Sequence, residues 1–455
     1  MTVALREDVL SAFEGFGGRL LRPGDEGYDE ARRIHNTLID RRPALIAECT
    51  GTADVVMAVN AAREHGLEIT VRGGGHNVAG LSVRDDALLV DLSRMKGMHV
   101  DPEARTVRAQ GGVRWSELNR ETQLHGLAVT GGAVSTTGIA GLTLGGGLGW
   151  LLGKYGLAAD NLLSAEVVTA DGRVVTASAA TNADLFWGLR GGGGNFGVVT
   201  SFEYRLHPVG PTIFGGLVAH PIDRARDLLR LYREVTQDVP DELTMFAGVT
   251  HAPDGSGAKI AVIAGAHVGD PATAERDLAA VRSFGSPILD VFGPMPYTTL
   301  NQMLDGGFPP APIYWRSSFL DGLTDAAIDT IVDRFLVSAS PMSAILLEHF
   351  HGAVTRVPVD ATPVQHRAVG YNCLVSAVWM DPADTEANVA WARGAYDALA
   401  PFFAARRWLN YADVEGDDQA RLRAAYGPNY ERLRLVKRDW DPTNLFHVNQ
   451  NILPA

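Results

Sequence analysis

The sequence predicts an α+β protein of two domains, and three observations lead to this prediction. A chain of 455 residues exceeds the usual size of a single hydrophobic core. The first 210 residues are rich in glycine and in short strand-like segments, whereas long amphipathic helices alternate with strands from 211 onward. From about 403 the chain is expected to return to short elements. The predicted segments are therefore 1–210, 211–402 and 403–455.

Glycines and turn residues bound the expected elements of the first segment. Thr52 precedes an apolar periodic run and is expected to cap a helix that Gly66 ends. The dipeptide Asp171-Gly172 suits the turn of a hairpin. The expected helices cover 53–65, 115–125 and 184–189, and the expected strands cover 67–72, 87–92, 106–110, 164–169, 173–177 and 198–206.

The second segment combines longer helices with apolar strands. The expected helices cover 222–235, 272–284, 325–337 and 385–399, and the expected strands cover 243–249, 259–266, 344–350 and 372–379. This order predicts one antiparallel sheet covered by helices on one face.

The composition excludes several classes of function. A formal net charge of −13 disfavours nucleic acid and anionic membranes as partners, since both require basic patches. No apolar run approaches the ~18 residues of a membrane-spanning helix, and the first residues lack the pattern of a secretory signal. Cys49 and Cys373 form neither a disulfide framework nor a metal-ligand cluster. We expect a cytoplasmic protein without a metal site.

Three glycine clusters, 73–75, 138–149 and 191–197, are the main functional signal. Glycine lets the backbone N–H groups approach a large ligand closely, so the clusters indicate a long phosphate-bearing ligand along several loops. The first cluster presents His76. An isolated histidine of this kind is either a satisfied loop residue or a side chain presented to a cofactor.

The standard nucleotide motifs do not explain these clusters. Residues 192–197 match G-x-G-x-x-G, but a β-branched run follows where a dinucleotide site requires a helix. Residues 153–155 lack the leading glycine and the Ser/Thr of a P-loop. The sequence contains no H-E-x-x-H zinc motif and no G-x-S-x-G elbow. A bare NAD-dependent enzyme is therefore a remote alternative.

The order of the loops resembles a known family. The chain contains Arg72-Gly73-Gly74-Gly75-His76-Asn77, then 138–147, then 154–161, and the tail segments 426–433, 441–446 and 449–452. This series resembles the vanillyl-alcohol oxidase / p-cresol methylhydroxylase (PCMH) superfamily, and within it the berberine bridge enzyme-like branch. The resemblance covers essentially the whole chain. It implies a PCMH-type FAD-binding domain at 1–210, a substrate domain at 211–402, and a segment, 403–455, that returns to the FAD-binding domain.

The resemblance also implies which residues hold FAD. His76 matches the histidine that is bonded to the 8α-methyl of the flavin. The glycine loops, Ser82 and the tail asparagines would surround the phosphates and the flavin, because backbone N–H groups hold phosphate and side-chain amides match the ring edge. The full expected set is His76, Arg72, Gly73, Gly74, Gly75, Asn77, Ser82, Val134, Thr137, Gly138, Gly141, Gly147, Val198, Asn449 and Asn451.

The chain departs from the family pattern at two places beside Gly138. Many members attach FAD a second time through a cysteine, and Val134 stands at that place, so we expect a single covalent link through His76. Thr137 stands at the position that gates oxygen in the family. Because threonine is small enough not to block O₂, the resemblance favours an oxidase over a dehydrogenase.

Two residues are candidates for the catalytic base. Tyr411 matches the last tyrosine of a Tyr-x-Asn-Tyr motif in which Trp408 replaces the first tyrosine, and its pKa must fall from about 10 if it is to act at neutral pH. Glu348, on the strand 344–350, is either a second base or a paired carboxylate. Tyr371 and His349 are weaker candidates, since alternation places His349 on the face opposite Glu348.

The resemblance therefore implies an FAD-dependent oxidase that removes a hydride from a small-molecule substrate, with O₂ reduced to hydrogen peroxide. The substrate class stays open among sugars, aromatic alcohols, alkaloid amines and secondary metabolites. The alternatives are a dehydrogenase with another acceptor and a flavin-binding protein without turnover. An aromatic pocket from Trp150, Trp315, Trp379 and Trp408 is possible, as are a monomer and a homodimer.

Overall fold

The computed structural model describes residues 7–412 and 419–455. The first sheet has the order β1-β2-β4-β3, and β2, β4 and β3 are parallel. Helix α3 (Thr52–His65) connects β2 to β3 and packs on β4. The strands of this sheet are β1 (Arg19–Leu21), β2 (Leu45–Glu48), β3 (Ile69–Arg72) and β4 (Leu88–Asp91).

The second sheet is antiparallel, with the order β5-β6-β10-β8-β9. A two-stranded ladder of β7 (Leu127–Ala128) and β11 (His207–Pro208) lies apart from it. Its strands are β5 (Met98–Asp101), β6 (Thr106–Gln110), β8 (Leu162–Val168), β9 (Val174–Ser178) and β10 (Val198–Arg205). The remaining helices of this segment are α1 (Glu7–Ser11), α2 (Tyr28–Ala31), α4 (Trp115–Thr122), α5 (Ile139–Leu144), α6 (Leu152–Tyr155) and α7 (Ala183–Leu189).

The third sheet is the largest and is antiparallel throughout. Its order is β15-β12-β14-β13-β18-β19-β17, and β16 also pairs with β12. The strands are β12 (Thr212–Pro221), β13 (Leu243–His251), β14 (Lys259–His267), β15 (Leu289–Asp290), β16 (Gly293–Pro296), β17 (Ile313–Leu320), β18 (Ala344–Phe350) and β19 (Gly370–Val378).

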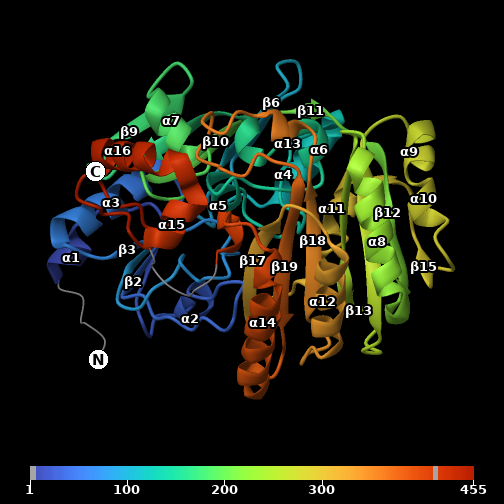
Figure 1. Cartoon of the computed structure of the whole chain (residues 1–455). Helices are drawn as coiled ribbons and strands as arrows, with labels where there is room; N and C mark the ends of the chain where they lie inside the picture. The colour runs from blue at the N-terminus through green and yellow to red at the C-terminus, as the bar shows by residue number, and fades with distance from the viewer. Residues whose placement is uncertain (1–6, 413–418) are drawn as a thin grey trace.

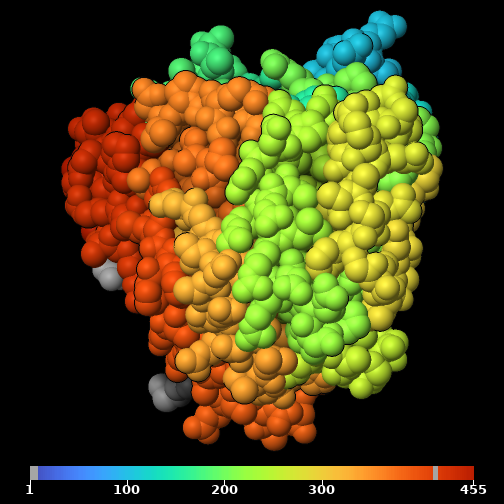
Figure 2. All heavy atoms as spheres, turned by 45° about the vertical axis from the view of Figure 1, so that its right-hand side comes forward, coloured from blue at the N-terminus to red at the C-terminus, as the bar shows by residue number. Residues whose placement is uncertain are grey.

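Helices cover one face of this large sheet (Figure 1). Helices α8 (Ala225–Val235), α12 (Asp325–Leu336) and α14 (Thr385–Leu399) bury their apolar stripes in the largest hydrophobic core. Figure 2 shows the side chains of α8, in light green, on the outer surface beside those of α9 (Pro271–Asp277) and α10 (Ala279–Arg282), in yellow. The other sheet face turns toward the two smaller sheets, so a space between the domains is available for ligands. The short helices α11 (Tyr297–Gln302) and α13 (Ala353–Arg356) complete this segment.

The structure bears out the predicted α+β class and its antiparallel sheet with helices on one face. Three predictions about elements are wrong. Within the described part of 403–455, α15 (Gln419–Tyr426) and α16 (Tyr430–Trp440) are regular helices where short elements were expected. The helix expected at 272–284 is two helices, α9 and α10. Gly51, not Thr52, is the N-cap of α3, because the Thr52 hydroxyl donates to Glu166 over 2.8 Å.

No sheet of the described residues contains strands from both sides of residue 210, although the boundaries themselves stay a prediction. Asn36 joins the two segments. Its side-chain amide donates to the carbonyls of Val78 and Ile313, and its Oδ1 accepts from Ile313 N over 2.9 Å. Because Asn36 is fully buried, these bonds fix the position of β17 against the loop that follows His76.

Candidate active site

A cavity of about 720 Å³ runs between the glycine loops of the first segment and the open face of the large sheet. Its walls come from the loop after β3, the segments 132–145 and 191–199, the strands β12, β13, β14, β17, β18 and β19, and the tail 446–450. Segments that are far apart in the sequence therefore converge on one elongated space.

His76 lies in the wall of this cavity. Its Nε2 is 3.2 Å from the Thr136 hydroxyl, and its ring stacks on His35 with centroids 3.7 Å apart. Burial, with a smaller contribution from His35, lowers the pKa of His76 to about 3. The imidazole is therefore neutral at physiological pH, and one of its ring nitrogens carries an unprotonated lone pair.

The glycine loops meet at backbone distance. A Cβ on Gly74 would lie 2.5 Å from the backbone of Gly138, and a Cβ on Gly138 would lie 2.5 Å from Gly74 N. On Gly141 or Gly194, in contrast, a Cβ would meet nothing within 4 Å, so a side chain there would enter the cavity. The absence of side chains at Gly74 and Gly138 lets the two loops touch, and their absence at Gly141 and Gly194 leaves room in the cavity.

Several polar groups at the cavity have no partner within the described chain. The buried Ser82 Oγ and Asn449 Oδ1 accept no hydrogen bond. The Asn449 amide nitrogen donates to Gly194 O and Phe446 O, which points its free oxygen elsewhere. Since buried polar atoms are normally paired, these atoms indicate a polar ligand.

Of the residues expected at the cofactor, twelve line the cavity: Gly73, Gly74, Gly75, His76, Asn77, Ser82, Val134, Thr137, Gly138, Gly141, Val198 and Asn449. Arg72, Gly147 and Asn451 do not. Gly147 N instead donates to Asn410 Oδ1 over 3.2 Å. Asn451 is 7% exposed, and its carbonyl accepts from Gln419.

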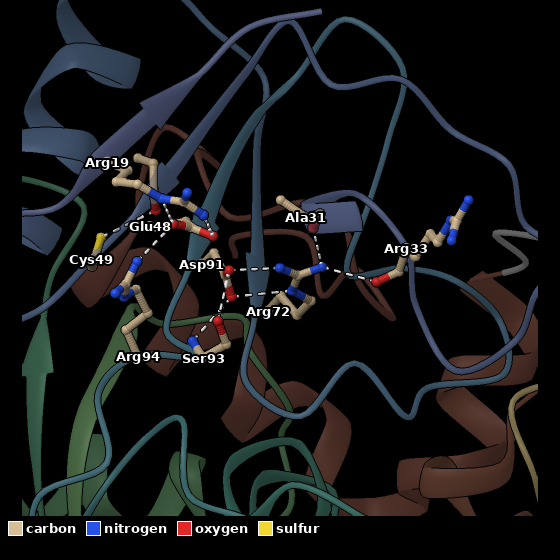
Figure 3. Close-up of polar contacts among 10 residues, drawn as sticks. Arg19, Ala31, Arg33, Glu48, Cys49, Arg72, Asp91, Ser93 and Arg94 are labelled. Carbon is tan, nitrogen blue, oxygen red and sulfur yellow. Dashed lines mark hydrogen bonds and ion pairs between the residues drawn. The ribbon is translucent and has the colours of Figure 1, made fainter. Parts of the chain in front are cut away.

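The Arg72 guanidinium is fully engaged away from the cavity. It forms two hydrogen bonds with Asp91, of 3.1 and 2.6 Å, and donates to the carbonyls of Ala31 and Arg33 (Figure 3). Asp91 is completely buried and also accepts from Ser93. The side chain of Arg72 therefore fixes the end of β3 rather than reaching a ligand.

Glu348 lies at the cavity wall on β18, and two side chains donate to it. Tyr411 OH is 2.9 Å from Oε1, and Asn372 Nδ2 is 2.6 Å from Oε2. Asn372 comes from β19, where it stands directly opposite Glu348 in the ladder. Glu348 and Tyr411, two separate candidates in the sequence, thus belong to one hydrogen-bonded group.

The pKa values of Glu348 and Tyr411 show which of the two side chains can accept a proton near neutral pH. Burial raises the pKa of Glu348 to about 7, against lowering by its bonds from Asn372 and Tyr411. Burial and the neighbouring Glu348 carboxyl hold the pKa of Tyr411 well above 10. The lowered pKa that Tyr411 needs as a base is not found, whereas Glu348 gains a proton close to neutral pH.

The weaker candidates lie on the other side of the large sheet. His349 and Tyr371 stand opposite each other in the β18–β19 ladder, and Tyr371 OH is 2.6 Å from the Thr236 hydroxyl beneath the helices. Trp315 and Trp408 line the cavity, and Trp315 meets Tyr411 edge to face at 5.4 Å. Trp150 and Trp379 are core residues, 0% and 1% exposed.

Family models match two parts of the chain. Residues 43–178 match the model described as an FAD binding domain, and residues 408–453 match the model described as berberine and berberine like. An FAD-linked oxidoreductase of Dictyostelium discoideum is 31% identical over 97% of this chain and 96% of its own. The (R)-6-hydroxynicotine oxidase of Paenarthrobacter nicotinovorans is 32% identical over 96% of this chain and 97% of its own.

The chain belongs to the berberine bridge enzyme-like family of FAD-linked oxidoreductases. A solved structure supports the fold as well. The 6-hydroxy-D-nicotine oxidase from Arthrobacter nicotinovorans superposes with a TM-score of 0.87 at 30% identity, over 97% of this chain and 98% of that one. The protein is thus an FAD-linked oxidoreductase with the two-domain fold of its family.

The residues of this berberine bridge enzyme-like protein fit FAD. The cavity is long, its glycine loops expose backbone N–H groups, and its orphaned polar atoms, Ser82 Oγ and Asn449 Oδ1, suit a polar ligand. The described residues contain no group of histidine, cysteine or carboxylate side chains that could hold a metal ion. No described helix is long and apolar enough to span a membrane.

Two residues beside the candidate active site, Asn372 and His35, were not predicted from the sequence. Asn372 begins an expected strand, but its partner Glu348 becomes visible only through the β18–β19 register. His35, which stacks on His76, is a single histidine in an irregular segment, and nothing in its local sequence marks it. Both depend on pairings between distant parts of the chain.

Proposed function

We propose that the protein is an oxidase that holds FAD through one covalent bond to His76 and removes a hydride from an alcohol or amine carbon of a small molecule. The observation that carries this proposal is the buried Glu348 carboxyl, with Tyr411 and Asn372 donating to it, in the wall of the cavity that His76 also lines. The proposed base, Glu348, and the proposed flavin attachment residue, His76, thus line the same cavity.

FAD supplies the two-electron acceptor when it is bound. The protein binds the substrate against the sheet face and provides the base. The Glu348 carboxylate takes the proton of the substrate hydroxyl or ammonium as the hydride leaves the adjacent carbon. Tyr411 and Asn372 hold the two carboxylate oxygens, so one rotamer of Glu348 is kept aimed along the wall.

Glu348, rather than Tyr411, is the base in this proposal. A base works best when its pKa lies near the operating pH, and a pKa of about 7 meets that condition. Tyr411, with a pKa well above 10, stays protonated and serves as a hydrogen-bond donor to Glu348. The sequence alone left the choice between these two residues open.

Oxygen is the proposed electron acceptor, and hydrogen peroxide the proposed product. Thr137 in the cavity wall is small, and Val134, which cannot form a thioether, supports the single linkage. Two relatives are named as oxidases of 6-hydroxynicotine, a small molecule, which supports a small-molecule substrate here. A dehydrogenase with another acceptor is the second candidate, and oxygen consumption with peroxide release separates the two.

The test compares flavin reduction in the wild type, Glu348→Gln and Tyr411→Phe, using a panel of a sugar, an aromatic primary alcohol and a tertiary amine. We expect Glu348→Gln to slow reduction by about 10²–10⁴-fold. Tyr411→Phe removes a bond that lowers the pKa of Glu348, so the midpoint of its pH–rate profile moves above about 7. A Tyr411→Phe loss as large as that of Glu348→Gln, with an unshifted midpoint, would make Tyr411 the base.

A further inference from the structure

The large sheet extends well beyond Glu348 as an open floor of small and aliphatic side chains. In the ladders, the row through Glu348 contains Phe246 and Ala264, and the next row contains Leu346, Leu374, Gly248 and Val262. Because these residues lie at two-residue steps, their side chains point to the same face as Glu348.

A third row lies one step further along the strands. On one side, Ile260 of β14 pairs with Thr250 of β13; on the other, Ala344 of β18 pairs with Ser376 of β19, which pairs with Trp315 of β17. The β13–β18 ladder ends one residue before Thr250 and Ala344, which brings the two halves of this row side by side. The distance from Glu348 to Ala344 is four residues, or about 13 Å of extended strand. All five residues line the same cavity as His76 and Glu348, so this floor is continuous with the site of reaction. We call the second and third rows the trough.

Apolar residues from outside the sheet also line the cavity. Phe308, from the loop after α11, and Met342, from the loop before β18, pack with the cluster that contains Trp315 and Leu374. Met303 and Leu304, from the same loop as Phe308, pack nearer Phe246 and Ala264. These four side chains are only partly buried. Methionine adapts its shape to an apolar ligand, so these residues are suited to close around one.

The charges in the cavity restrict the ligand further. Among the described residues that line it, Glu348 is the only carboxylate, and none is arginine or lysine. The glycine N–H groups that suit the diphosphate of FAD belong to the loops 73–75 and 138–141 and not to the trough, so an anionic group in the trough would find no counter-ion. The trough offers the hydroxyls of Thr250 and Ser376 and the indole N–H of Trp315, and the last two have no partner among the described residues. A sugar carries more hydroxyls than these three groups can satisfy, so it would lose most of its hydrogen bonds to water without replacement.

We propose that the trough binds the non-reacting part of the substrate, and that this part is an uncharged, apolar body, such as a fused-ring system, that reaches about 13 Å from Glu348. The inference rests on the proposed function in placing the oxidised carbon at Glu348. It narrows the substrate to a large hydrophobic alcohol or amine, and it excludes free sugars and carboxylated or phosphorylated compounds.

A matched pair of probes tests the trough without turnover. N-phenyl-1-naphthylamine is an uncharged aromatic compound, and 8-anilinonaphthalene-1-sulfonate has the same body with one negative charge. Equilibrium dialysis against the FAD-loaded protein measures the Kd of each. We expect the uncharged probe to bind at least about tenfold more tightly, because the sulfonate finds no cation. Equal affinities would overturn the proposal.

Two substitutions locate the bound probe. Val262→Asp places a charge in the middle of the floor and is expected to weaken the uncharged probe by about tenfold or more. Met380→Asp is the matched control: Met380 is 65% exposed and does not line the cavity, so affinity should not change. If Val262→Asp does not fold, as judged by its circular dichroism, Leu346→Gln takes its place. Affinity unchanged in the trough variant would place the probe elsewhere and refute the proposal.

Competition completes the test and separates it from the proposed function. Cellobiose at millimolar concentration should not displace the uncharged probe, whereas 2-naphthylmethanol should; the reverse result would overturn the trough as an apolar site. If 2-naphthylmethanol binds in a Val262-dependent way but no alcohol or amine reduces the flavin, the trough stands and the proposed function fails. If a sugar reduces the flavin through Glu348 while no apolar probe binds, the function stands and the trough fails.

Discussion

Glu348 carries a buried carboxyl group, and its burial makes the free energy of unfolding depend on pH. Its pKa of about 7 exceeds the ordinary value of 4.5, because burial penalises the charged form. The group therefore contributes its full stability below pH 4.5, and this contribution is lost as the pH rises through about 7.

Glu348→Gln should consequently slow the reaction but make the protein more stable at pH 8, by about 2–3 kcal/mol. Glutamine keeps an acceptor for Tyr411, and Asn372 Oδ1, which has no partner, is available to accept from the new amide. Urea unfolding at pH 8 and pH 4.5 measures the effect, and the difference should vanish at the lower pH. A variant that is no more stable than the wild type at pH 8 would show that Glu348 is not held neutral by burial.

Arg72 provides a second prediction at the residue scale. Arg72→Ala leaves the fully buried Asp91 without its partner, so we expect a loss of about 3–5 kcal/mol in the free energy of unfolding. The double variant Arg72→Ala/Asp91→Ala should lose less than the sum of the two single variants. Strictly additive losses, from urea unfolding of all three proteins, would contradict a coupled ion pair. The sequence placed Arg72 at the cofactor because it adjoins the glycines, and only the fold reveals Asp91 as its partner.

At the scale of elements, the glycine loops are the most informative feature of the sequence. Their number and order predicted a long ligand-binding site, because loops whose backbone must approach a ligand closely are rich in glycine. Strands β12 and β17 were not predicted. β12 contains two glycines and a proline, and β17 is buried at every position, so neither shows the alternation of a half-exposed strand. Helix α16 was missed because its buried face carries Lys437, which is paired with Asp441 over 2.7 Å.

The contact between the loops gives a prediction for an element. Gly138→Ala puts a methyl group 2.5 Å from Gly74 N, so the two loops must separate and the cavity wall must open. We expect the ratio of bound flavin to protein to fall several-fold. Gly394→Ala is the control: Gly394 is exposed in α14 and has open space around it, so this change should stabilise the protein by about 0.5–1 kcal/mol. Full flavin content in Gly138→Ala would show that the close approach is not required.

At the scale of the whole molecule, the candidate active site forms where the first sheet, the third sheet and the C-terminal segment pack together. His76 follows the first sheet, Glu348 belongs to the third, and Tyr411 lies in the segment after it. Asn36 and the Ser135–Asp305 bonds, of 2.8 and 2.6 Å, tie these units together. The residue types at the site could be predicted from local sequence, but the Glu348–Tyr411 contact could not, because it depends on packing between elements 63 residues apart.

The attachment of FAD to His76 is the central claim, and one measurement tests it most directly. The purified protein is denatured in acid, run on a gel and examined for flavin fluorescence in the protein band, beside His76→Ala. A fluorescent band that is absent in the variant is the predicted result. A yellow native protein whose flavin is lost on denaturation would contradict the covalent bond, and a fluorescent band that persists in His76→Ala would place the bond at another residue.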